Sequence, residues 1–144
     1  MSDSAYLDTS VLAKWYLAEE NTEAVTQYII SLEDAFISHL TITEMRCLLA
    51  KHRRMRHFSE KIEQQIYATF LNDIQLGYLR VAAFMESHFT MAATLITDLP
   101  KVSLRTLDAL HLSIVQQAEI AYLATADEVI EKAAKQLGIQ VKRF

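Results

Sequence analysis

Four acidic residues occupy places where a chain of alternating strands and helices exposes reactive groups. Asp8 follows the apolar run Ala5-Tyr6-Leu7, Glu44 and Asp108 lie in the first turns of predicted helices, and Asp127 comes three residues after a predicted strand that ends at Ala124. In an open parallel sheet, ligands bind beyond the carboxyl ends of the strands, so we expect the four side chains to converge. Two like charges ~4 Å apart repel by roughly 4 kcal/mol at an effective dielectric near 20. Such a cluster takes up protons or binds a cation.

The chemistry of the donors indicates which cation that would be. Carboxylate oxygens, with the hydroxyls of Thr9 and Ser10 beside the first acid, are the ligands of Mg²⁺ or Mn²⁺. Zinc is disfavoured because Cys47 is the only cysteine and the loops contain no close pair of histidines. The residues therefore favour a magnesium or manganese site.

Each acid also has an alternative interpretation as a helix cap. Asp8 suits an N-cap, and Thr41-x-x-Glu44 and Thr125-x-x-Glu128 both match the capping-box pattern. The helix dipole favours Asp108 in a first helical turn. Three of the acids, however, have apolar neighbours in sequence, which predicts partial desolvation and favours the cluster: Leu7, Leu107, Ala109 and Ala126.

The composition limits the class of protein. The 144 residues suit one domain, with few turns because there are only two glycines and one proline. The net charge of −4 means that any binding of nucleic acid must rest on a local basic patch and a metal. The single cysteine fits a reducing, cytoplasmic compartment. Met1 to Leu7 has no features of a signal peptide, and we expect no membrane span.

The hydrophobic pattern predicts an α/β fold with a mostly parallel sheet of about four or five short strands flanked by helices. The predicted strands are residues 5–7, 35–38, 78–84, 120–124 and 139–141. The predicted helices are about residues 11–16, 21–32, 41–57, 59–76, 86–98, 106–118 and 127–137, with Gly138 ending the last one.

Two motifs resemble a known family. Tyr6-Leu7-Asp8-Thr9-Ser10-Val11-Leu12 is similar to the opening of PIN-domain proteins, and Leu104-Arg105-Thr106-Leu107-Asp108-Ala109-Leu110-His111-Leu112 is similar to the third acidic motif of VapC-type toxins. Thr43-Glu44 lies between them, and Thr125-Ala126-Asp127 follows. The resemblance extends from Ala5 to about Val141 and implies a single PIN domain over residues 1–144.

This resemblance implies a magnesium- or manganese-dependent endoribonuclease, the toxin of a type II toxin–antitoxin module, which cleaves RNA to inhibit translation. It implies three kinds of partner: an RNA substrate, a VapB-type antitoxin and a second copy in a homodimer. It assigns Asp8, Glu44, Asp108 and Asp127 as catalytic metal ligands, with Thr9, Ser10 and Thr125 as supporting hydroxyls. Family members often carry an aromatic residue after the fourth acid, whereas Val129 and Ile130 follow here, so Glu128 remains an alternative to Asp127.

Basic residues provide the expected RNA contacts. The segment from Lys51 to His57 contains Arg53, Arg54 and Arg56, which either contact phosphate or form the solvated end of a helix. Arg105, three residues before Asp108, would contact a substrate phosphate or pair with an acid. His111 lies one turn beyond Asp108, and we interpret it as a packed core residue in preference to a catalytic one.

Other classes of protein fit less well. A haloacid-dehalogenase-type phosphatase needs a second Asp where Ser10 stands, and a receiver domain needs an acid pair where only Asp3 is present. A housekeeping PIN-type nuclease acting in RNA processing remains the nearest alternative. A catalytically inactive RNA-binding domain is a further alternative, although four intact acids argue against it.

Overall fold

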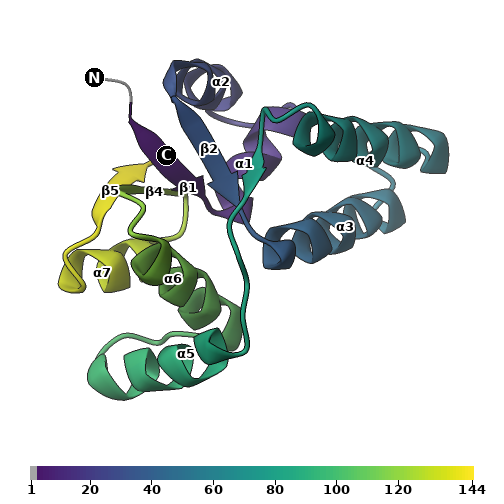
Figure 1. The fold of residues 1–144 in the computed structure, drawn as a ribbon. Coiled ribbons are helices and arrows are strands. Elements are labelled where there is room, and N and C mark those ends of the chain that lie inside the picture. The colour runs from purple at the N-terminus through teal and green to yellow at the C-terminus, as the bar shows by residue number, and fades with distance from the viewer. Residues whose placement is uncertain (1–2) are drawn as a thin grey trace.

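A five-stranded parallel sheet forms the centre of the computed structural model, which describes residues 3–144 (Figure 1). Its strands are β1 (Ser4–Leu7), β2 (Asp34–Ile37), β3 (Arg80–Val81), β4 (Tyr122–Thr125) and β5 (Gln140–Arg143). They lie in the order β3-β2-β1-β4-β5, so the first strand is central. The predicted fold class is confirmed. The expected absence of a signal peptide concerns Met1–Leu7, whose first two residues lie outside the described part.

Seven helices surround the sheet within residues 3–144: α1 (Thr9–Tyr16), α2 (Thr22–Ser31), α3 (His39–Arg54), α4 (Glu60–Gln75), α5 (Ser87–Asp98), α6 (Thr106–Ala118) and α7 (Glu128–Gln136). Figure 1 shows the α3–α4 pair and the α5–α6 pair extending to different sides of the central strands. Gly138, at φ +77°, follows the end of α7, as predicted. None of the helices described is long and apolar enough to cross a membrane.

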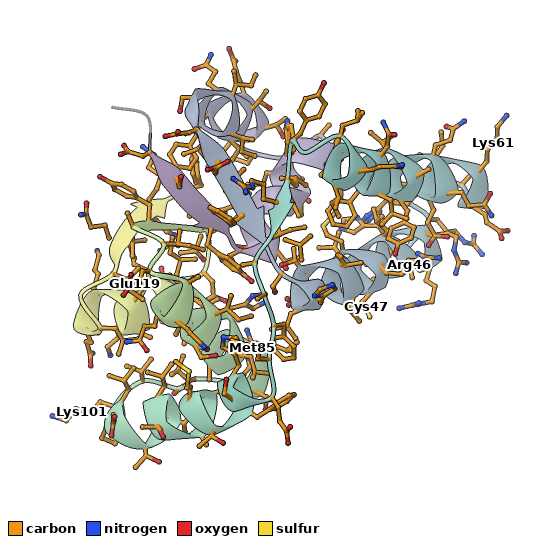
Figure 2. The ribbon with its side chains drawn as sticks, viewed as in Figure 1. Arg46, Cys47, Lys61, Met85, Lys101 and Glu119 are labelled. Carbon is orange, nitrogen blue, oxygen red and sulfur yellow. The ribbon has the colours of Figure 1, made fainter. Side chains whose placement is uncertain are left out.

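Burial on both faces of the sheet explains why its strands read as apolar runs. Tyr6 of β1 packs in a core with Leu112 of α6 and Leu123 of β4, whereas the adjacent Leu7 packs in a second core with Leu12 of α1 and Met45 of α3. Side chains fill the space between these layers (Figure 2). Because β1 is enclosed on both faces, the residue that follows it is held in a fixed position.

The start of α3 differs from the prediction. The helix begins at His39, with Ser38 as its N-cap and Thr41 completing the capping box. The proposed Thr41-x-x-Glu44 capping box is therefore wrong, and Glu44 lies beyond the first turn, so its carboxylate is not used as a cap. Thr125-x-x-Glu128 is not a capping box either, because Asp127 is the N-cap of α7.

The strand predicted over residues 78–84 is much shorter in the structure. Only Arg80 and Val81 pair with β2, opposite Phe36 and Ile37. The partner strand limits this pairing, since β2 ends at Ile37 and Ser38 already caps α3. Ala82 donates one further backbone hydrogen bond to Ile37 before the chain leaves the sheet.

Candidate functional site

One cleft of about 680 Å³ collects all four predicted acids at the carboxyl edge of the sheet. Asp8 comes from the end of β1, Glu44 from α3, Asp108 from α6 and Asp127 from the loop after β4. Thr9, Ser10 and Arg105 also line it, and Leu40, Leu48, Phe84 and Leu107 give it an apolar wall. The four acids that were expected to converge therefore line the same cleft. Glu128, the alternative fourth acid, does not line the cleft.

Asp8 is the most enclosed of these acids, with an exposed fraction of 5 %. Its Oδ1 accepts a hydrogen bond from the backbone N of Thr9 at 2.9 Å. Its Oδ2 accepts from Ser10 Oγ at 2.7 Å and from Thr125 Oγ1 at 3.0 Å. Burial raises the pKa of Asp8, the two hydroxyls and His111 partly offset this, and the charge of Glu44 adds to it. Asp8 thus caps α1 and also contributes a desolvated carboxylate to the cleft.

A single guanidinium bridges the other two aspartates. Arg105 donates to Asp108 Oδ2 from its backbone N at 3.1 Å and from Nε at 3.4 Å, and its Nη2 lies 3.6 Å from Asp127 Oδ2. Asp127 Oδ1 accepts from the backbone N atoms of Val129 and Ile130. The Arg105 side chain is 77 % exposed, so it can turn away without uncovering the core. Both aspartates act as caps while facing the cleft.

Glu44 is held by neighbours from α1 and α6, and Tyr6 of β1 supports the second of these. Its Oε1 accepts a hydrogen bond from Thr9 Oγ1 at 3.1 Å and is in contact with His111 Nε2. His111 Nδ1 lies 2.6 Å from the hydroxyl of Tyr6. Burial is the main cause that raises the pKa of this phenol, so it keeps its proton.

His111 is the residue that the sequence analysis underestimated. It is buried in the core, with an exposed fraction of 2 %, as expected, yet its ring also contacts a candidate ligand. Its spacing from Asp108 was the available signal, because residues three apart share one face of a helix.

The oxygen atoms that line the cleft are of the type that a hard divalent cation prefers as ligands. Four carboxylates converge on one cleft, and the buried Asp8 lies among hydroxyls with no basic side chain in hydrogen-bonding contact. Across residues 3–144, however, no three His, Cys, Asp or Glu side chains are already placed to hold one ion. The hydrogen bonds explain this, because Asp108 and Asp127 face Arg105 while Glu44 faces His111. A cation would displace Arg105 and draw the carboxylates together.

The predicted RNA-contacting residues fall into two places. Arg105 lines the cleft, whereas Arg53, Arg54 and Arg56 do not. Arg54 lies ten residues after Glu44 along the chain, which corresponds to about 15 Å of helix. Arg53 Nε is 2.9 Å from Oε1 of Glu63, a buried residue on α4. Arg53 therefore links α3 to α4 whatever else it contacts.

The family profile of the PIN domain matches residues 5–136. The chain belongs to the PIN domain family. No curated protein is significantly similar to this PIN domain in sequence.

Solved structures share the fold of this PIN domain at low sequence identity. FitAcB from Neisseria gonorrhoeae has a TM-score of 0.71 at 20 % identity and covers 95 % of both chains. VapC20 from Mycobacterium tuberculosis, described as a sarcin–ricin loop cleaving toxin, has a TM-score of 0.71 at 17 % identity, covering 90 % of this chain and 94 % of the other. The structure of VapBC2 from Rickettsia felis, bound to a DNA fragment from its promoter, has a TM-score of 0.67 at 18 % identity. The match covers 97 % of this chain and 98 % of the other.

Proposed function

We propose that this PIN domain is a metal-dependent endoribonuclease and the cytoplasmic toxin of a type II toxin–antitoxin module. The observation that carries the proposal is the cleft in which Asp8, Glu44, Asp108 and Asp127 converge. A cluster of carboxylates with one exposed arginine attracts a divalent cation more readily than a phosphate. The similar structures of toxins and toxin–antitoxin complexes support the module, and VapC20 supports RNA as the substrate.

Asp8 and Asp108 are the proposed central ligands of Mg²⁺ or Mn²⁺, with Glu44 and Asp127 completing the set. The cation supplies positive charge that offsets the charge developing on the scissile phosphate. Thr125 and Ser10 hold Asp8 in place through its Oδ2, and Thr9 holds Glu44. Arg105, once released from the aspartates, is close enough to the cleft to contact an RNA phosphate.

A small antitoxin and a second copy of the chain are the proposed protein partners. Exposed apolar side chains on α4 and in the segment after it offer surface for such contacts, among them Ile62, Leu71, Leu76 and Tyr78. An antitoxin segment that reaches the cleft would meet its apolar wall and the acids together.

Cleavage of RNA by the purified chain tests the proposal most directly. Antitoxin-free protein should cut RNA in Mg²⁺ or Mn²⁺ and stop in EDTA, and the Asp8→Asn variant should be inactive under the same conditions. Sequencing of RNA 5′ ends after expression should show cuts at a defined site. Cleavage that continues in EDTA would refute the metal-dependent mechanism.

Growth distinguishes a toxin from a housekeeping nuclease. Expression of the chain alone should arrest growth, and co-expression of a short neighbouring reading frame should restore growth and yield a stable complex. A protein that cuts RNA in vitro but is harmless alone and purifies without a partner is instead a housekeeping PIN nuclease acting in RNA processing. A protein that binds RNA without cutting it in any metal is an inactive RNA-binding domain.

A further inference from the structure

A buried chain of polar side chains runs from the start of α3, through the middle of the sheet, to the cleft. Ser38 Oγ lies 2.8 Å from the hydroxyl of Tyr6, and this hydroxyl lies 2.6 Å from His111 Nδ1. The other ring nitrogen of His111 contacts Glu44 Oε1. Ser38, Tyr6 and His111 are each at most 2 % exposed, whereas Glu44 is partly open to the cleft. The chain therefore connects the core to one candidate metal ligand.

The hydrogen bonds of this chain engage both ring nitrogens of His111. An ionised carboxylate only accepts hydrogen bonds, so His111 Nε2 carries the proton that reaches Glu44. On the other side of the ring, Nδ1 is hydrogen-bonded to the hydroxyl of Tyr6, whose phenol keeps its proton because burial raises its pKa. The Tyr6 hydroxyl donates to Ser38 Oγ, which also accepts from the backbone N of Thr41. Every polar atom along the line has a partner.

We propose that His111, oriented by Tyr6, is a positioning residue that fixes the Glu44 carboxylate for metal binding. The proposal deepens the proposed function and rests on it. His111 Nε2 and Thr9 Oγ1 both engage Oε1, which leaves Oε2 without a hydrogen-bonding partner in residues 3–144. Outer partners that orient a ligand in this way contribute about 10–100-fold to metal affinity.

A packing role alone would not require both ring nitrogens to be used. His88 on α5 shows the difference, because it is equally buried, stacks on Phe84 and bonds only to Met85 of its own turn. Within residues 3–144 it forms no hydrogen bond or ion pair with the four acids and does not line the cleft, so it provides a matched control. The same substitution at His88 and at His111 removes an imidazole of similar burial from two different places.

Titration calorimetry of the metal-free protein with MnCl₂ tests the proposal without measuring cleavage. His111→Asn, which loses the donor at the Nε2 position, should weaken Mn²⁺ binding about tenfold. His111→Gln, which can place an N–H near that position, should recover most of the affinity. His88→Asn should bind Mn²⁺ as the wild type does, although its melting temperature falls. Equal losses in His111→Asn and His111→Gln, or unchanged affinity in His111→Asn, would overturn the positioning role.

Tyr6→Phe provides a second variant in case His111→Asn does not fold. It keeps the ring that packs in the core and removes only the hydroxyl that orients His111. Mn²⁺ affinity should fall by about threefold, less than the roughly 10–100-fold effect of a direct outer partner because Tyr6 acts on Glu44 only through His111, and affinity within twofold of the wild type counts against the proposal. Asp8→Asn separates the two hypotheses. If it binds Mn²⁺ normally, the metal site and the positioning role both fail. If only Asp8→Asn weakens binding, the positioning role alone fails.

Discussion

Two buried carboxylates in this PIN domain have opposite surroundings. Glu63 on α4 is bracketed by Arg53 Nε at 2.9 Å and by Arg46 Nη1 at 3.3 Å, and Arg46 also stacks on the Tyr67 ring. Figure 2 labels Arg46 on α3. Asp8 is similarly buried, but its hydrogen bonds come from two hydroxyls and one backbone N–H, and burial raises its pKa, with a smaller contribution from the charge of Glu44.

This difference shows that the charge of Glu63 links two helices, whereas the charge of Asp8 is available to a ligand. Arginines neutralise Glu63 and hold α3 against α4, so its charge is compensated within the fold. Within residues 3–144 no arginine or lysine pairs with Asp8, and two hydroxyls and a backbone N–H hold its carboxylate instead. Uncompensated buried charge is typical of functional sites, where stability is given up for binding.

The largest expected effect is on the rate of RNA cleavage when a carboxylate of the cleft loses its charge. Asp8→Asn and Asp108→Asn should each lower the rate of RNA cleavage at least about 100-fold, because each removes a charge that the cation needs. Initial rates in Mn²⁺ on a defined RNA, with circular dichroism to confirm folding, measure this. Glu63→Gln is the matched control, and its cleavage rate should stay within a few-fold of the wild type. Near-normal rates in both aspartate variants would leave the acids as caps only.

The stability of Asp8→Asn in EDTA should change with pH in a defined direction. Burial raises the pKa of Asp8 above its ordinary value of 3.8, so the fold favours the protonated form. Below pH 3.8 the ionisation of Asp8 does not lower the free energy of unfolding. Between pH 3.8 and the raised pKa it lowers this free energy progressively, and above the raised pKa the loss is complete. The uncharged amide of the variant has no such cost, so the variant should be more stable than the wild type at neutral pH, by about 1.4 kcal/mol per unit of raised pKa. Urea unfolding at pH 7 and pH 3.5 should show the advantage shrinking on acidification.

Loss of the ion pair between Arg53 and Glu63 should lower the stability of the fold without affecting the cleft. Arg53→Ala should reduce the free energy of unfolding by about 1 kcal/mol, a value reduced for solvent screening because the arginine is partly exposed. Arg54→Ala, one residue further along, is the control and should be nearly neutral. Thermal unfolding of the two variants side by side decides this, and equal melting temperatures would show that Arg53 does not stabilise the α3–α4 contact.

The smallest expected effect concerns the end of α3. Arg54 and Arg56 form no ion pair within residues 3–144, so they are available to RNA phosphate. Replacing both with Ala should lower the slope of log affinity against log salt by about 1 for each lost phosphate contact. Fluorescence anisotropy of a labelled RNA across a salt series measures the slope. If the slope is unchanged, this end of α3 is a solvated surface.

Local sequence signals were sufficient to predict where the acids converge. Asp8, Asp108 and Asp127 each follow a short apolar run or begin a helix, and the regular alternation of elements places such positions at one edge of the sheet. The hydrophobic periodicity also located the helices to within a few residues. Asp127 was preferred to Glu128 by motif, and the cleft contains Asp127.

Contacts between distant parts of the chain could not be predicted in this way. The partners of His111 are 105 and 67 residues away, so no short pattern reveals that its two ring nitrogens are used. The pairing of Arg53 with Glu63 depends on how α4 packs against α3. The sequence predicted Arg53 as an RNA contact, whereas this pairing gives it a structural role. The early end of β3 depends on the cap of α3, which a strand pattern does not contain.

The central position of β1 also has a consequence for synthesis. The strand is made first, yet its second neighbour is β4, whose register joins Ala5 to Tyr122 and Leu7 to Ala124. The hydroxyl of Thr125 that holds Asp8 arrives with that same strand. A nascent chain that ends before Asp108 therefore lacks β4, so one edge of β1 is unpaired. It also lacks two of the four acids of the cleft. Because the N-terminal parts of a chain emerge first, the ribosome that makes this protein is exposed to a completed cleft only after Asp127 has been translated.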